Sequence, residues 1–252
     1  MVVKIKKKQY ESGHAKLLES WDKLIAFSET LDQERLNPPD DLKLAALKAV
    51  AAQGGDLQLS VGNSRADWRT IALARAVIVD TFETRASQAV GQLAGRGASK
   101  ETVKDARGYV RKLQGKRSKA KPQDNPETPD IDESEKGVSA SQQSSAAMIS
   151  TYFELLDFLE AQDAYAGVTK AELLIANLRA VGEEAQTKHE ESIAAAAKLS
   201  SDRRERNKHF YLDAGCICEL AARFKELVKG EYGAGSPEYK AVNAIKFKKA
   251  KL

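Results

Sequence analysis

Apolar residues recur at helical spacing along most of the chain. Positions three or four apart carry apolar side chains in these stretches: 21–31, 42–50, 68–93, 103–113, 149–159, 174–199 and 217–228. This period is typical of amphipathic helices that bury one face. The one alternating run, Leu57–Val61, is too short and too closely flanked by helical pattern to predict a strand. The sequence therefore predicts an all-α fold.

Proline and glycine predict where the helices of the first half end. The first helix is expected to end within Asn37–Asp40, because the two prolines there cannot continue it. Asp40 or Asp41 can then cap the next helix. A kink or break is predicted at Gly54-Gly55, since glycine is a poor helix former.

The second half is predicted to contain one very long helix. Thr169 is expected to cap it, and no proline interrupts the sequence from there to about Leu212. Since the usual helix has about 11–12 residues, one of this length needs other helices alongside it or a partner chain. A last helix is predicted from Ile217 to about Tyr232, followed by a tail that is non-helical or a single turn.

A polar segment separates the two helical halves. Residues 116–145 hold three prolines, many serines and glutamines and almost no large apolar residue, and their charge changes from basic to acidic. Such a sequence buries too little surface to offset its ordering entropy. It is either a solvated tether or a segment that docks on a neighbouring subunit. The predicted architecture is two tandem, related bundles of three to four helices each, 1–115 and 146–252, joined by this linker.

The two halves are similar in sequence. Displacing the first half by 131 positions places Trp21 on Tyr152 and Leu47 on Leu178. A displacement of 118 positions places Gly115 on Gly233. The pattern predicts an internal duplication, whose first copy is about 13 residues longer in its middle. The two bundles would then pack with pseudo-two-fold symmetry.

Composition narrows the class of protein without indicating an activity. The chain has 252 residues, 42% of them hydrophobic, two cysteines, and a net charge of +4 from 40 basic and 36 acidic residues. These values exclude a disulfide scaffold, a collagen-like chain and a wholly disordered chain. No apolar run is long enough to span a bilayer. The basic start lacks the apolar region of a signal peptide, so we expect a cytoplasmic location, with export by another route or surface association left open.

Segments towards the C-terminus resemble a family of bacterial all-helical proteins. The shared features are an R-N-x-x-x-Y stretch at Arg206–Tyr211 and, after a helix, a G-A-x-S-P-x-Y-K tail at Gly233–Lys240. A basic K-L-Q-G-[KR]-R segment, Lys112–Arg117, also matches. The chain departs from the pattern at Cys216–Cys218, where relatives are expected to carry a longer polar loop. The resemblance implies a helical fold and no activity.

The residues that could carry chemistry do not form a recognisable motif. His209, Cys216 and Cys218 supply at most three ligands, whereas a structural zinc site needs four. Buried apolar cysteines are the simpler interpretation. The sequence contains no phosphate loop, no convincing nucleophilic triad and no paired Glu-x-x-His motif. We expect no catalytic residue, no metal and no cofactor, and a protein that is not an enzyme.

Basic clusters are the most prominent polar feature. The candidate contacts to a polyanion are Arg111, Lys112, Lys116, Arg117, Arg203, Arg204, Arg206 and Lys208. They could bind nucleic acid through its phosphates or an acidic protein surface, the acidic part of the linker included. They could equally be solvated cations that favour helix C-termini.

The C-terminal tail carries regularly spaced apolar residues. The candidate assembly residues are Pro237, Tyr239, Val242, Ile245 and Phe247. The tail either folds back on its own bundle or docks on a neighbouring copy, which would build a ring or a filament. We expect a non-enzymatic helical scaffold that acts by self-association, for instance as a subunit of a larger homomeric assembly. The alternative is a nucleic-acid-binding protein.

Overall fold

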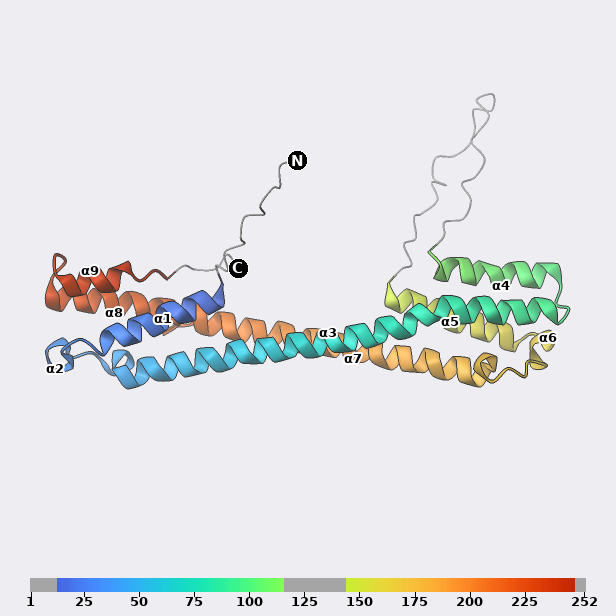
Figure 1. Cartoon of the computed structure of the whole chain (residues 1–252), viewed down its shortest axis with the longest axis horizontal. Helices are drawn as coiled ribbons and strands as arrows, with labels where there is room; N and C mark the ends of the chain where they lie inside the picture. Colours follow the sequence, from blue (N-terminus) through green and yellow to red (C-terminus); the bar gives the residue numbers. More distant parts are fainter. Residues whose placement is uncertain (1–12, 116–143, 248–252) are drawn as a thin grey trace, which may run out of the picture. The chain divides into compact units, whose positions relative to one another are not determined.

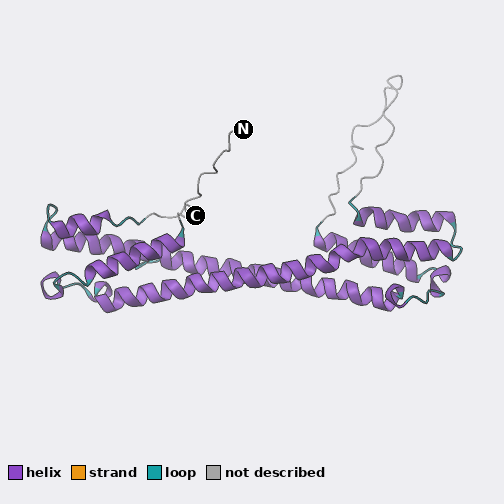
Figure 2. Cartoon of the chain, viewed as in Figure 1, coloured by secondary structure: helices purple, strands orange, loops and turns teal. Residues whose placement is uncertain are grey.

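The computed structural model describes residues 13–115 and 144–247. Within these residues every regular element is a helix and no strand occurs (Figure 2). The all-α prediction is therefore confirmed. The elements in chain order (Figure 1) are α1 (His14–Ser28), α2 (Gln33–Leu36), the 3-10 helix η1 (Asp40–Leu42), α3 (Leu44–Gly95), α4 (Lys100–Leu113), α5 (Ser145–Glu160), α6 (Asp163–Ala166), the 3-10 helix η3 (Ala171–Leu173), α7 (Ile175–Asn207), the π-helix η4 (Lys208–Leu212), α8 (Ile217–Tyr232) and α9 (Pro237–Ala244).

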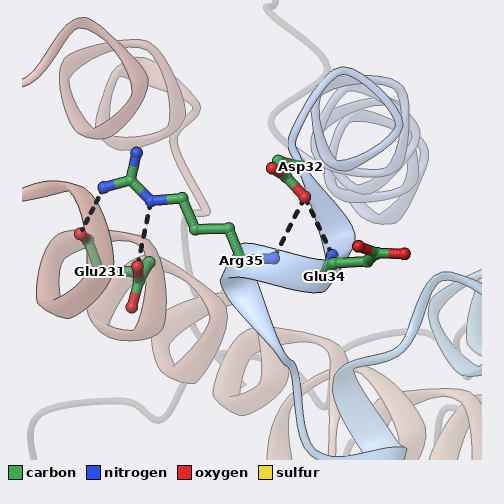
Figure 3. Close-up of polar contacts among 4 residues, drawn as sticks. All are labelled: Asp32, Glu34, Arg35 and Glu231. Carbon is green, nitrogen blue, oxygen red and sulfur yellow. Dashed lines mark hydrogen bonds and ion pairs between the residues drawn. The ribbon is translucent and has the colours of Figure 1, made fainter.

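The first helical region divides in two because Asp32 begins a new helix. After α1 ends, the Asp32 carboxylate accepts hydrogen bonds from the backbone N–H groups of Glu34 and Arg35, both at 3.1 Å (Figure 3). This cap satisfies donors that the first turn of α2 would otherwise leave unpaired. The prediction of one helix continuing to Asn37 is therefore wrong.

The next helix begins later than expected and does not break at its glycines. Asp40 and Asp41 lie in η1 instead of capping α3, which begins at Leu44. α3 then continues through Gly54-Gly55 to Gly95. A Cβ atom at Gly54 would lie 2.8 Å from Leu18 Cδ2. The missing side chain therefore lets α1 approach α3 closely, and the helix is not broken at the two glycines.

The second half differs from the predictions at both of its ends. α7 begins at Ile175, after η3, and not next to Thr169. The helix continues as the π-helix η4 to Leu212, close to the predicted end. The tail contains a regular helix, α9, because Ser236 caps it by accepting the N–H of Tyr239 at 3.0 Å.

The contacts divide the chain into two compact units that each combine both halves of the sequence. Unit 1 comprises Met1–Asp67 and Ala196–Leu252, and unit 2 comprises Trp68–Ala195. α3 and α7 each contribute one part to either unit. This division differs from the predicted tandem bundles 1–115 and 146–252, because each long helix continues beyond the unit in which it begins. Nearly all of the predicted linker lies outside the described residues.

The core of unit 1 is built from large apolar side chains of both sequence halves. Trp21 of α1 is fully buried, and its Nε1 donates to the carbonyl of Leu47 in α3 at 3.1 Å. Phe210 and Phe224 from the second half pack into the same cluster. Unit 1 therefore needs residues separated by more than half of the chain.

The core of unit 2 has the same mixed origin. Phe82 of α3 stacks on Tyr152 of α5, with ring centroids 4.0 Å apart and an interplanar angle of 7°. Val103 and Val110 of α4 join this cluster together with Leu178 of α7. The apolar face of α4 therefore packs on elements from the other half of the chain.

The first part of the proposed duplication is matched element by element. α5, η3 and α7 begin at Ser145, Ala171 and Ile175, each 131 positions after the start of α1, η1 and α3. One contact also recurs at this displacement. Arg206 lies 131 positions after Arg75, and His189 lies 131 positions after Gln58. Arg75 contacts His189 in unit 2, and Arg206 contacts Gln58 in unit 1. These coincidences support a common origin of the two halves.

In the last part of each repeat, the elements that correspond are not the ones that the sequence predicted to correspond. The buried residues Phe82, Ala86, Ala89 and Leu93 at the end of α3 lie 135 positions before Ile217, Ala221, Phe224 and Val228 of α8, which are also buried. α4 and α9 both begin after a capping serine, Ser99 and Ser236, with glutamate in the first turn. These features pair α8 with the end of α3, and α9 with α4. The displacement of 118, which paired α4 with α8, does not fit these features.

Candidate functional site

Residues 71–79 of α3 are apolar on every side of the helix. Arg75 is the only polar residue among them. Helices of this kind are normally enclosed by other elements, yet in unit 2 Leu73 is 68% exposed and Val77 is 67% exposed. Val79 is the first of these nine residues to be buried in the core of unit 2. This part of α3 therefore presents to solvent a surface that resembles a core.

Arg75 shows which side of the segment faces α7. Its Nη1 lies 3.4 Å from His189 Nδ1 and donates to Ser192 Oγ at 3.5 Å. At about 3.6 residues per turn, Leu73 and Val77 project from the opposite side of α3. The contact with α7 therefore leaves uncovered the side of the helix that carries Leu73 and Val77.

Charged residues of opposite sign flank the exposed apolar pair. Arg69 lies four residues before Leu73, and Asp80 lies three residues after Val77, so that all four share one face of α3. Both charged residues are exposed. We call these four residues the α3 stripe. In the second repeat the positions equivalent to residues 71–79, namely 202–210, are mostly polar or charged, so the stripe is not required by the shared fold.

Arg206 is buried and is not part of a basic surface. It is only 7% exposed, and its guanidinium donates to Gln58 Oε1 at 3.3 Å and to Asn207 Oδ1 at 3.0 Å. Burial lowers its pKa, and the nearby charges of Arg203 and Arg65 act in the same direction. The guanidinium joins α7 to α3 within unit 1. We therefore remove Arg206 from the predicted contacts to a polyanion.

The other predicted basic contacts are exposed or lie outside the described residues. The exposed ones are Arg203, Arg204 and Lys208 in unit 1 and Arg111 and Lys112 in unit 2. Lys112 Nζ lies 4.0 Å from Glu154 Oε2 and 5.3 Å from the centroid of the Tyr109 ring. Lys116 and Arg117 are not among the residues described. The described cations are thus divided between the two units, and their predicted contact with a polyanion stays a prediction.

A polar cluster anchors the start of α1 in unit 1. His14 Nε2 lies 3.1 Å from Asn207 Oδ1, the same oxygen that accepts from Arg206. Burial lowers the pKa of His14, and the charge of Arg206 lowers it further. The rings of Phe210 and Tyr211, both in the π-helical turn, each lie 5.6 Å from the imidazole. Much of the R-N-x-x-x-Y stretch therefore holds α1 against the end of α7.

A second polar group in unit 1 joins α3 to α7 around one carboxylate. Asp202 accepts hydrogen bonds from the hydroxyls of Ser60, at 3.1 Å, and Ser64. Lys198 Nζ donates to Ser64 Oγ at 2.9 Å and lies 3.6 Å from the carboxylate. These bonds hold the pKa of Asp202 below its usual value. The group links two helices within unit 1.

The residues considered for a metal site have structural roles. Cys216 and Cys218 are buried in the core of unit 1. His209 Nε2 lies 3.1 Å from the carbonyl oxygen of Val50. Within residues 13–115 and 144–247, no three His, Cys, Asp or Glu side chains form a group that could hold a metal ion.

The C-terminal tail packs on its own unit. The candidate assembly residues Pro237, Tyr239, Val242, Ile245 and Phe247 lie in α9 or directly after it. Val242 is fully buried, and the Phe247 ring lies 6.1 Å from Trp21 in an edge-on arrangement. Lys225 of α8 donates to the carbonyl of Ile245. The apolar side of the tail therefore has a partner within the chain, which weakens the case for docking on a neighbour.

Arg35 fastens the short helix α2 to the end of α8. Its Nε donates to Glu231 Oε1 at 3.1 Å and its Nη2 to the Glu231 carbonyl at 3.3 Å (Figure 3). The guanidinium also lies over the Tyr232 ring, 4.5 Å from its centroid. The contact combines an ion pair with a cation at a helix C-terminus. Sequence reasoning did not single out Arg35, because no motif marks it.

The α3 stripe was also not singled out, although a signal was present. The run of apolar residues at 71–79 is visible in the sequence, but only the structure shows that Leu73 and Val77 within it are exposed. Among the residues described, no helix is long and apolar enough to cross a membrane.

Comparisons with known proteins do not assign the chain to a family. No protein-family model matches the chain, and neither a curated protein nor a solved structure matches it. The resemblance to a bacterial all-helical family therefore stays a prediction.

Proposed function

We propose that this chain is a non-enzymatic helical structural protein that acts by self-association, and that two copies meet through the α3 stripe. One observation carries the proposal. Leu73 and Val77 are about two-thirds exposed in a segment that is apolar on every side. Two exposed apolar side chains next to each other on one helix face favour an interaction site, whereas single exposed apolar residues need no such explanation.

The order of residues in the stripe favours a second copy as the partner. The stripe reads basic, apolar, apolar, acidic along α3. If two copies lie antiparallel about a two-fold axis, Leu73 of one copy faces Val77 of the other, and Arg69 comes close to Asp80. Such a contact is self-complementary in shape and in charge, as an isologous interface must be.

The proposed contact is small, and its strength should reflect that. One helix face of about three turns buries less than the roughly 1,200 Å² of a standard stable interface. We therefore expect reversible dimerisation that depends on protein concentration. The two symmetry-related charged pairs lie at an exposed rim and each adds only modestly to the affinity, whereas reversing one charge replaces both attractions with repulsions and weakens the dimer measurably.

Size-exclusion chromatography with light scattering across a concentration series tests the proposal. We expect the mass to rise from monomer towards dimer, and the variant Leu73→Lys/Val77→Lys to stay monomeric because it places like charges in the contact. Leu212→Lys, at a residue that is 61% exposed in unit 1, is the matched control and should behave like the unmodified chain. A monomer at every concentration, or equal dimerisation of all three proteins, would reject the proposal.

A further inference from the structure

We infer that the two halves of the chain, residues 1–115 and 144–252, are separate interaction partners that hold together without the segment between them, and that a second copy can supply either half. This inference does not rest on the α3 stripe. It follows from the way in which the two halves share both cores.

Unit 1 is held together by contacts between the halves. His14 contacts Asn207, and Trp21 packs edge-on against Phe247. A Cβ at Gly54 would meet Phe210 Cε1 at 3.3 Å, so the helices pass very close here. These contacts run from the start of α1 to the tail, and none of them depends on residues 116–143.

Charged contacts across the halves add specificity to unit 1. Arg35 bonds to Glu231, and Arg223 forms an ion pair with Asp41. They lie on exposed surface, where such pairs contribute little stability but disfavour wrong pairings. Each half therefore carries both the apolar surface and the charges that recognise the other half.

Unit 2 also combines both halves, but it takes the end of the first half and the beginning of the second, whereas unit 1 takes the beginning of the first and the end of the second. Here the end of α3 and α4 come from the first half, whereas α5, α6 and the start of α7 come from the second. Phe82 stacks on Tyr152, and the Tyr109 ring lies 5.8 Å from that of Phe158. Neither half alone completes a core.

The covalent connection between the halves is one segment of the sequence. This segment, residues 116–143, joins Gly115 to Ser144, and both of these residues belong to unit 2. Two copies that exchanged halves would make the same contacts in both units as one copy does. Exchange of this kind is a low-cost route to a dimer.

Cleavage of the full-length protein tests the inference. A protease site is inserted between residues 116 and 143, and the purified protein is cut and passed over a size-exclusion column in native buffer. We expect the two fragments to elute together at the position of the uncut protein, with unchanged helical circular dichroism. Fragments that elute apart, each with native helix content and a cooperative melting transition, would show independent tandem bundles and overturn the inference.

Separation and remixing of the fragments provide the quantitative test. Fragments parted in urea should each lose most of their helical signal after the urea is removed, and regain it when mixed one to one. Trp21→Ala should weaken this reassembly by about a hundredfold or more, because it removes a fully buried side chain from the core that the two halves share. Leu212→Ala should reassemble normally, and so should Leu73→Lys/Val77→Lys, which separates this test from that of the α3 stripe.

Discussion

Single residues determine how closely the long helices pack, and two of their glycines show opposite cases. In α7, a Cβ at Gly182 would lie 2.9 Å from two carbons of the Phe153 ring and 3.4 Å from Tyr152 Cδ1. In α3, a Cβ at Gly62 would meet nothing within 4 Å. Both glycines lie inside a helix, where glycine costs about 1 kcal/mol relative to alanine. At Gly182 the absent side chain makes room for the Phe153 ring, whereas at Gly62 a side chain would meet no neighbour within 4 Å.

Replacing each of these glycines with alanine should have opposite effects. Gly182→Ala forces the Phe153 ring to move and should lower the free energy of unfolding by about 1–3 kcal/mol. Gly62→Ala should raise it by about 0.5–1 kcal/mol, because alanine is the better helix former. Urea denaturation followed by circular dichroism measures both, and a similar stabilisation by the two variants would contradict the packing at Gly182.

His14 should make the stability of unit 1 sensitive to acid. Its pKa in the folded chain lies below the ordinary value of 6.5, because of burial and the nearby Arg206. Below pH 6.5 the imidazole therefore binds a proton more readily in the unfolded chain than in the folded chain. The free energy of unfolding is unaffected by the titration of His14 above pH 6.5 and declines as the pH falls below that value.

The variant His14→Gln keeps a donor for Asn207 but cannot titrate. We expect the unmodified protein to lose more stability between pH 7.5 and pH 5 than this variant does, in parallel urea titrations at each pH. If the two proteins showed the same pH dependence, the buried imidazole would have no part in it.

Helix ends set by local chemistry could be predicted from the sequence, whereas those set by packing could not. α3 ends at Gly95, next to the positive φ of Gly97, and α4 begins after Ser99, whose side chain accepts the N–H of Thr102; glycine and serine mark such ends in the sequence itself. Gly54 was mistaken for a break, because its role depends on the close approach of Leu18 from α1, where a Cβ would not fit, and the sequence does not show that approach. The same limit applies to the burial of Arg206, which depends on the helix that packs against it.

The short helix α2 should depend on its Asp32 cap. Asp32→Ala removes the acceptor for the N–H groups of Glu34 and Arg35 (Figure 3) and should lower the free energy of unfolding by about 1 kcal/mol. Asp32→Asn keeps an acceptor oxygen and should lower it much less. The two variants are compared in urea denaturation; equal losses would mean that the charge of Asp32, and not the cap, is what matters.

For the whole molecule, the sequence indicated a duplication but not how the copies combine. Helical periodicity and the displacement of 131 are local properties of the sequence, and they led to the expectation of two tandem bundles. Phe82 stacking on Tyr152 and Trp21 packing with Phe247 are long-range contacts that no periodicity encodes. Each unit therefore combines the beginning of one repeat with the end of the other, which the linker position alone could not reveal.

The α3 stripe is the feature that distinguishes the first repeat from the second. Residues 71–79 are apolar on every side, and the equivalent residues 202–210 are mostly polar or charged. The described part of each chain would thus contribute one such surface. In the proposed dimer the surfaces of two copies cover each other, so the assembly closes at two subunits. In the proposed dimer, the charges at the ends of the stripe, Arg69 and Asp80, would set the antiparallel direction.

Charge reversal within the stripe, measured by sedimentation equilibrium, tests this association most directly. Arg69→Asp and Asp80→Arg should each weaken the dimer, because each places like charges opposite one another. The double variant Arg69→Asp/Asp80→Arg restores opposite charges and should recover most of the lost affinity. Double and single variants with the same affinity, or an unmodified chain that remains a monomer at every concentration, would contradict self-association through the stripe.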